Sequence, residues 1–235
     1  MTQNDPKYQS GDAPDASQYA DDVIMSKDVF RENRMPPGQT RTRKWPVLHA
    51  TTVPTVSIET WNLEINGLVE TPLAFNWEQF QKLPRVKVFA DFHCVTTWSR
   101  LGNLWEGVSV KEILNRVQVQ AEAKYVILGG YDGNWTTNLP LEDFYSPDAL
   151  LCDVHDGEPI DADHGGPVRM IVPLLYAWKS AKWLKSITFV SDDCPGFWER
   201  NGYHNHGDPW VQNSNHPDGE RFHPPSYPSP SSQPF

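Results

Sequence analysis

Proline and glycine interrupt this chain so often that long helices are excluded. Its 235 residues include 21 prolines and 15 glycines. Proline lacks the backbone N–H that a helix interior needs, and both residues favour turns. The apolar runs between these breaks are short, and 10 Trp, 10 Phe and 8 Tyr supply enough bulk for a real core. The sequence therefore predicts an α+β fold with mixed β-sheets and short helices.

The two ends of the chain differ in composition from its centre. Residues 1–22 are polar, acidic and punctuated by proline and glycine, so we expect a flexible N-terminal segment. Residues 213–235 are rich in proline and serine, and we expect a disordered tail. A single folded domain is predicted over residues 23–212.

Turn and cap signals place several elements within this domain. Asn66-Gly67 lies between two apolar runs, which predicts a hairpin of residues 61–65 and 68–75. Asn76 is expected to cap a helix over residues 77–82, and Ser109 with Glu112 forms a capping-box pattern that begins a helix over residues 110–117. Further strands are predicted at residues 86–92, 125–128, 135–139, 149–154, 167–173 and 186–190.

Charge and cysteine content limit the class of partner and the compartment. A net charge of −10 argues against nucleic acid or an anionic membrane as the main partner. Three scattered cysteines are too few for a disulfide framework, which suggests free thiols in a reducing compartment. The N-terminus has no export signal and no stretch is long enough to span a bilayer, so a soluble cytoplasmic protein is expected.

Cys94 follows the strand predicted at residues 86–92. Two aromatic, polar-edged turns with Trp98, Arg100 and Trp105 are expected after it, which puts the thiol in a loop. Loops held by rigid elements often carry reactive groups, although a free cysteine is also often a small buried hydrophobe.

Two alternatives for this chemistry stay open. Cys152-x-x-His155 and His204-x-His206 have ligand-like spacing for zinc, but Cys152 lies in an apolar strand and no second close pair accompanies it. A hydrolase could use Cys94 as its nucleophile, but the adjacent His93 would point to the opposite face of the strand. Phosphate loops of the GxxxxGK[ST] and GxGxxG kinds and a GxSxG elbow are absent.

Basic and glycine-rich segments accompany the lone loop cysteine. The run from Arg41 to Lys44 is either a solvated surface or an anion clamp, and Gly129-Gly130 is either a plain hairpin turn or a close approach to a ligand. Together with Cys94 they suit a soft metal that has one thiolate ligand and a large anionic organic ligand.

Four motifs point more specifically to such a metal site. They are Phe30…Asn33…Pro36, CVTTWS from Cys94, HGGPVR over residues 164–169, and Ser180-Ala-Lys-Trp183. In this order the chain resembles the sulfite oxidase family of molybdenum enzymes across about residues 30–190. It is most similar to the small single-domain bacterial members, and the cysteine loop is nearer to the catalytic subunit of bacterial methionine-sulfoxide reductase than to sulfite oxidase.

The resemblance implies a sulfite-oxidase-type molybdopterin-binding fold, with molybdenum held by one pterin dithiolene and by Cys94. No haem is expected, because the family's haem domain has no room in 235 residues. The residues that would contact the pterin and its phosphate are Phe30, Asn33, Arg34, Tyr131, Asp132, His164, Arg169, Ser180, Ala181 and Lys182.

Glu32 occupies a position where sulfite oxidases carry a substrate-binding arginine. The resemblance therefore implies two-electron oxygen-atom transfer on a small substrate, with S-oxide or N-oxide reduction favoured over sulfite oxidation. Electrons would pass singly to or from an unidentified partner. The alternatives are a molybdopterin-binding protein without turnover, or the Cys94 hydrolase.

Overall fold

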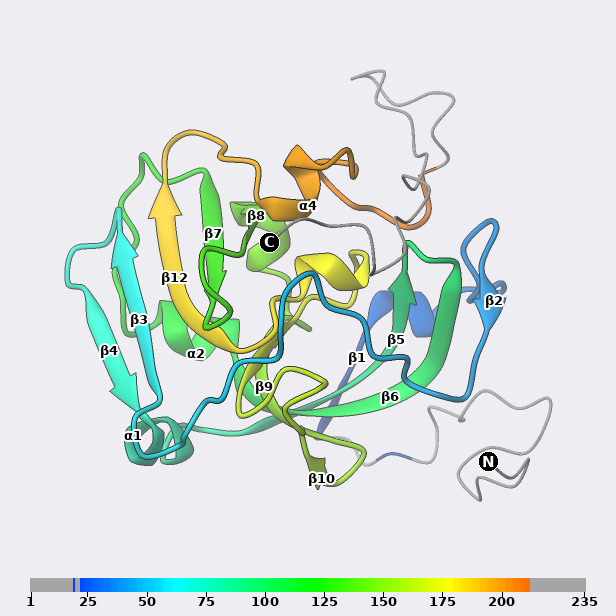
Figure 1. The fold of residues 1–235 in the computed structure, drawn as a ribbon, viewed down its shortest axis with the longest axis horizontal. Coiled ribbons are helices and arrows are strands. Elements are labelled where there is room, and N and C mark those ends of the chain that lie inside the picture. Colours follow the sequence, from blue (N-terminus) through cyan, green and yellow to red (C-terminus); the bar gives the residue numbers. More distant parts are fainter. Residues whose placement is uncertain (1–18, 20–21, 212–235) are drawn as a thin grey trace.

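Two β-sheets meet along a shared core (Figure 1). The computed structural model describes residue 19 and residues 22–211. The larger sheet has the strand order β1-β5-β6-β9-β10, with β2 on β6 and β11 on β9. Its strands are β1 Val23–Met25, β2 Thr40–Arg41, β5 Val86–Cys94, β6 Trp98–Ser109, β9 Leu150–His155, β10 Glu158–Pro159 and β11 Arg169–Ile171.

The smaller sheet has the order β4-β3-β12-β7-β8. Its strands are β3 Asn62–Gly67, β4 Leu73–Asn76, β7 Tyr125–Gly130, β8 Thr136–Pro140 and β12 Leu184–Val190. The pairs β1–β5, β2–β6 and β3–β12 are parallel, and the remaining pairs are antiparallel. The predicted mixed sheets are therefore confirmed.

Every helix among the described residues is short, as the prolines predict. The longest have five residues. The helical segments are η2 Lys27–Phe30, α1 Trp77–Gln81, α2 Val110–Leu114, α3 Leu141–Phe144, η3 Ala177–Lys179 and α4 Phe197–Arg200. None of the helices in this part of the chain is long and apolar enough to cross a membrane.

Both faces of the larger sheet are covered. On β9, Leu151 packs into the core shared with the smaller sheet, whereas Leu150 and Cys152 pack with Phe92 and Trp105 on the other face. Successive strand side chains point to opposite faces, so a strand buried on both faces must be apolar at consecutive positions. This explains why residues 149–152, which directly precede Asp153, are all apolar.

The cap predictions are confirmed and the predicted hairpin turn is displaced. The Asn76 side chain accepts from Gln79 N, and Ser109 accepts from Glu112 N. Residues 62–65 do pair with residues 73–76, but the strand β3 continues through Asn66-Gly67 and the connection is residues 68–72. Gly67 has φ +84°, and a Cβ there would meet Phe189 O at 2.2 Å, so the close approach of β12 requires this glycine.

The predicted aromatic turns after Cys94 are wrong. Residues 98–109 form one twelve-residue strand, β6, which pairs with β5. Gly102 suggests a turn, but its φ of +70° lies at a β-bulge opposite Asp91, whose side chain accepts from Gly102 N. The expectations for residues 1–18 and 213–235 concern positions outside the described residues, and the limits predicted for the folded domain stay a prediction.

Candidate active site

Cys94 ends β5 at a tight hairpin. A three-residue loop joins it to Trp98, with Thr97 N donating to Cys94 O at 3.0 Å. The Gln39 side chain donates to the same carbonyl at 3.1 Å and accepts from Ser99 Oγ at 3.2 Å. The Cys94 backbone is thus fixed from two sides, as a ligand position needs.

The Cys94 side chain lines a cavity of about 720 Å³, its open mouth included. Its thiol lies 3.2 Å from Thr96 Oγ1, and burial raises the pKa of this thiol. A reactive thiolate would need the opposite shift unless a cation lies beside the sulfur. Five of the residues predicted from the resemblance line this cavity together: Cys94, Asp132, Arg169, Ser180 and Lys182.

Arg169 is a buried cation whose hydrogen-bond partners among the described residues are neutral carbonyls. Its guanidinium donates to the carbonyls of His164 at 2.5 Å and Ser180 at 2.9 Å. The charge also lies over the rings of Trp45 and Phe92, 5.3 and 5.6 Å from their centroids. Burial lowers the pKa of Arg169 to about 10, which is the response of a charge that lacks a counter-ion.

Lys182 is a second cation at the same cavity whose hydrogen-bond partner is a neutral carbonyl. Its Nζ donates to the Asp163 carbonyl at 2.6 Å, and it forms no ion pair within the described residues. Burial, followed by repulsion from Arg169, lowers the pKa of Lys182 to about 7. A bound anion would stabilise the charged forms of both side chains, so the two side chains could hold an anion together.

Asp132 brings a carboxyl group to the same cavity. Its Oδ2 accepts from Thr51 Oγ1 at 2.7 Å, whereas its buried Oδ1 has no hydrogen-bond partner among the described residues. Burial raises the pKa of this carboxyl. A Cβ at Gly130 would meet Oδ1 at 2.3 Å, so the second glycine of the Gly-Gly pair makes room for the carboxyl group itself.

The residues predicted at 30–34 lie elsewhere. Phe30 is 70% exposed, Glu32 and Asn33 are exposed, and none of the three lines the cavity. Asn33 Oδ1 accepts from Met35 N at 3.0 Å. Arg34 binds the buried Asp91 through two contacts of 2.5 and 2.8 Å. Their roles toward a pterin or a substrate stay predictions.

Three further predicted residues support the site from outside the cavity lining. Tyr131 exchanges two 2.7 Å hydrogen bonds with the backbone of Asn62. Ala181 is fully buried, and its carbonyl accepts from Met170 N. His164 lies 2.8 Å from Asp161 Oδ1 and 3.0 Å from the Trp45 carbonyl.

The segment between β2 and β3 supplies lining residues that the sequence analysis missed. It crosses from the larger sheet to the smaller one (Figure 1) and contributes Trp45, Leu48 and His49 to the cavity. The Trp45 ring lies 4.1 Å from the His164 ring and 4.4 Å from the His155 ring. A tryptophan directly after a basic run was the available signal.

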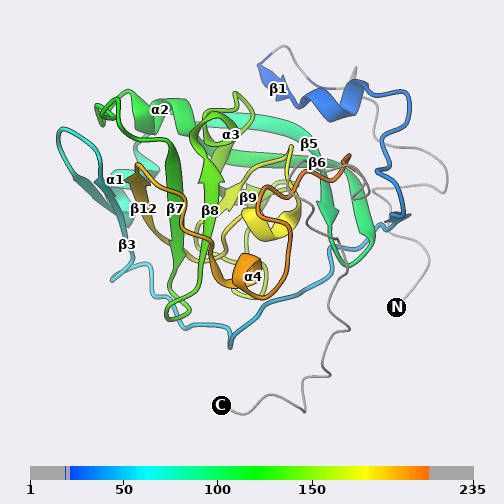
Figure 2. The ribbon, with the colours of Figure 1, turned by 90° about the horizontal axis from the view of Figure 1, so that it is seen from above.

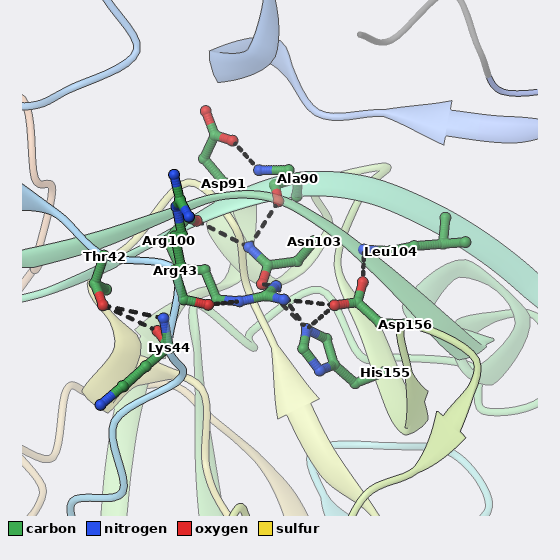
Figure 3. A network of polar contacts seen from close by, with 11 residues as sticks. Thr42, Arg43, Lys44, Ala90, Asp91, Arg100, Asn103, Leu104, His155 and Asp156 are labelled. Carbon is green, nitrogen blue, oxygen red and sulfur yellow. Dashed lines mark hydrogen bonds and ion pairs between the residues drawn. The ribbon is translucent and has the colours of Figure 1, made fainter. Parts of the chain in front are cut away.

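A buried polar network lies beneath this segment (Figure 3). Arg100 donates to Asp156 at 2.6 Å and to the Arg43 carbonyl at 3.4 Å, and it also contacts Asn103 and His155. Arg100 therefore ties the backbone just before Trp45 to β6 and to the end of β9. The basic run of residues 41–44 does not itself line the cavity.

The structure gives no support to the two alternatives. Among the residues it describes, no group of three or more His, Cys, Asp or Glu side chains is arranged to hold a metal ion. The Cys152 thiol donates to Val154 O, and burial raises its pKa to about 12. For the hydrolase, the Cys94 thiol contacts Thr96 and forms no hydrogen bond to a described histidine. His93 lies on the other face, against Ser99.

Comparisons with known proteins identify the family of the chain. Residues 49–198 match the family described as oxidoreductase molybdopterin binding domain, which is more than half of the chain. The uncharacterized oxidoreductase YuiH of Bacillus subtilis is 49% identical over 181 residues, which cover 77% of this chain and 91% of that protein. The chain therefore belongs to the molybdopterin-binding oxidoreductase family.

Two more distant similarities point the same way. The putative protein-methionine-sulfoxide reductase subunit YedZ1 of Azospira oryzae is 30% identical over 149 residues, which cover 63% of this chain and 56% of that subunit. The solved sulfane dehydrogenase SoxCD of Paracoccus pantotrophus has a TM-score of 0.55 at 24% identity, covering 60% of this chain and 40% of that one. The second similarity shows the shared fold alone.

The residues present fit the cofactor that this family binds. A pterin phosphate is an anion, and Arg169 and Lys182 are partly dry cations with neutral partners. Asp132 Oδ1 is a buried acceptor without a hydrogen-bond partner in the described chain. Cys94 supplies a soft sulfur ligand to the same cavity.

Proposed function

We propose that this chain reduces small neutral S-oxides or N-oxides by two-electron oxygen-atom transfer, in preference to oxidising sulfite. The observation that carries the proposal is the joint lining of one cavity by Cys94, Arg169 and Lys182. The similarity to the putative protein-methionine-sulfoxide reductase subunit YedZ1 of Azospira oryzae supports the direction of the reaction.

The resemblance, together with the contacts described above, gives each lining residue a proposed role. Cys94 would hold molybdenum together with the pterin dithiolene, Arg169 and Lys182 would hold the phosphate, and Asp132 would meet a polar group of the pterin. When bound, molybdenum supplies the two-electron chemistry. The reaction adds two electrons and two protons to an S-oxide and releases the sulfide and water, with the electrons coming singly from a partner protein.

The two cations hold their charge in place before the cofactor arrives. Arg169 is fixed by the carbonyls of His164 and Ser180, and Lys182 by the carbonyl of Asp163, which directly precedes His164. A Cβ at Gly165 would lie 2.7 Å from Lys182 Cγ, so this glycine lets the lysine stem pack closely. Each charge-assisted contact to a phosphate is worth roughly 1.5–3 kcal/mol, and fixed donors lose little entropy on binding.

Glu32 adds a second, independent argument about substrate charge. If its carboxylate faced the metal, it would repel sulfite by roughly 4 kcal/mol at contact distance and an effective dielectric near 20. Glu32 is exposed and outside the cavity lining, so this role rests on the resemblance alone. The variant Glu32→Arg tests it: a raised kcat/KM for sulfite supports a substrate-facing Glu32, and an unchanged value assigns it to the surface.

Metal analysis and dye-linked kinetics test the proposed function. The purified protein should contain molybdenum, and reduced viologen should drive turnover of dimethyl and methionine sulfoxides with a higher kcat/KM than sulfite shows with ferricyanide. Molybdenum without turnover of any substrate would instead favour a cofactor-binding protein. Efficient sulfite oxidation as the main activity would contradict the proposal.

A further inference from the structure

Two chemically different groups of residues are among those that line the cavity. The basic group is Arg169 and Lys182, described above. The aromatic group is Trp178, Trp198 and Tyr203, together with the apolar Val95 that packs with them; all four line the same cavity and carry no charge. Strand β5 connects them: Phe92 lies under the Arg169 guanidinium, Cys94 follows on the same strand, and Val95 comes next.

The aromatic group is a packed unit. Val95, Trp178 and Tyr203 form one buried apolar cluster, and Trp198 packs against it. The Trp178 and Tyr203 ring centroids are 5.0 Å apart in an edge-to-face arrangement, and the Trp198 and Tyr203 rings are stacked 4.8 Å apart. Such ring pairs are stabilising beyond the area they bury.

A buried ion pair fixes this unit to the segment that carries the basic group. Glu199 on α4 accepts from Lys179 at 2.6 Å, from Thr137 at 2.8 Å and from Trp178 Nε1 at 3.0 Å. Both charged side chains are at most 1% exposed. In both views α4 lies beside η3 (Figures 1 and 2), which immediately precedes Ser180.

A buried ion pair is weak evidence for stability but a plausible device for fixing one arrangement. Glu199 binds Trp178 directly, and it lies next to Trp198 in α4, so its contacts fix the helix that carries Trp198 beside Trp178. The Trp198 side chain therefore lines the cavity from a helix that is held in place, and the aromatic group is preorganised before a ligand binds.

We propose that the aromatic group is the specificity surface for the substrate, and that it selects neutral sulfoxides with one large apolar substituent, such as an aryl group. This inference rests on the proposed function. Because an anionic cofactor would pair with the basic group, the aromatic group would remain as an uncharged part of the lining for a substrate. The side chains of this group themselves carry no cation that could pair with sulfite or a carboxylate, and their rings favour flat apolar groups.

The test compares methyl phenyl sulfoxide with dimethyl sulfoxide in the molybdenum-loaded protein. A single methylene in an apolar site changes kcat/KM by roughly 10- to 200-fold. We therefore expect methyl phenyl sulfoxide to exceed dimethyl sulfoxide by at least about tenfold. Trp198→Ala should reduce this ratio to near one, and Trp198→Phe should retain most of it.

Calorimetry supplies a readout that does not need turnover. Without reductant, methyl phenyl sulfoxide should bind the native protein more tightly than dimethyl sulfoxide, and Trp198→Ala should remove the difference. Tyr145→Ala is the matched control, since Tyr145 is an exposed aromatic residue outside the cavity lining. It should leave both ratios unchanged.

The outcomes separate this inference from the function on which it rests. Turnover of both sulfoxides with equal kcat/KM, or a ratio that Trp198→Ala leaves intact, would overturn the aromatic selection and spare the proposed reductase. Reduction of neither sulfoxide by the molybdenum-loaded protein would overturn the reductase itself. An equal loss for both substrates in Trp198→Ala would show a structural role only.

Discussion

Charge reversal at Lys182 should abolish cofactor retention. Lys182→Glu removes one charge-assisted contact, worth roughly 1.5–3 kcal/mol, and adds a repulsion of roughly 4 kcal/mol at about 4 Å and an effective dielectric near 20. The sum is roughly 5.5–7 kcal/mol, or about 10⁴- to 10⁵-fold in affinity at about 1.4 kcal/mol per tenfold. Lys182 is partly exposed, so solvent screening lowers this limit, and we expect at least about a hundredfold loss.

The neutral variant Lys182→Met separates the two contributions. It should weaken binding by only about 10- to 150-fold, since no repulsion is added. Lys185→Glu is the matched control, with the same charge change at an exposed position outside the cavity lining. Arg169→Glu is also expected to abolish retention, but it leaves the carbonyls of His164 and Ser180 without their donor, so Lys182 gives the cleaner test.

The assay measures molybdenum and the fluorescent oxidised pterin per chain in each purified variant. The expected order is native and Lys185→Glu equal, Lys182→Met lower, and Lys182→Glu empty. Full occupancy in Lys182→Glu, with the control also full, would refute the assignment of the anion site. A parallel loss in Lys185→Glu would instead mean that only overall charge matters.

Three further results are expected. Cys94→Ser should fold and retain pterin but lose dye-linked reductase activity, because a hydroxyl replaces a soft thiolate poorly on molybdenum; unchanged activity would remove Cys94 from the metal. Glu199→Gln should lower the free energy of unfolding in urea by about 3–5 kcal/mol, because it removes the carboxylate beside the buried Lys179 and leaves that charge with the neutral oxygens of Asn138; a change below about 1 kcal/mol would contradict this. Burial lowers the pKa of His93 to about 4 and of His155 to about 3, so below pH 6.5 the unfolded chain binds protons that the folded chain does not. Stability should therefore fall with pH below 6.5, by up to about 1.4 kcal/mol per pH unit for each histidine, and His155→Gln should reduce that slope.

Local signals in the sequence predicted much of the fold. Asn76 and Ser109 begin helices as expected, and proline keeps the described helices short. The long strand β6 was missed because Gly102 and Asn103 resemble a turn. Their place in a strand depends on Asp91 and Ala90 of the paired strand, which accept hydrogen bonds from them. A pattern of neighbouring residues cannot indicate hydrogen-bond partners that lie on another strand.

The candidate site was only partly predictable for the same reason. The HGGPVR and SAKW motifs led to Arg169 and Lys182, and both line the cavity with Cys94. Arg34 was predicted as a pterin contact, but the structure pairs it with the buried Asp91, 57 residues away. Trp45 and Trp198 reach the cavity only through tertiary packing, so no spacing rule could assign them.

The sulfur coordination of molybdenum tests the central claim most directly. X-ray absorption at the molybdenum edge would compare the purified native protein with Cys94→Ser. The account predicts about one molybdenum per chain in the native protein and one sulfur neighbour fewer in the variant, with pterin retained in both. A native protein without molybdenum, or the same number of sulfur neighbours in both proteins, would contradict it.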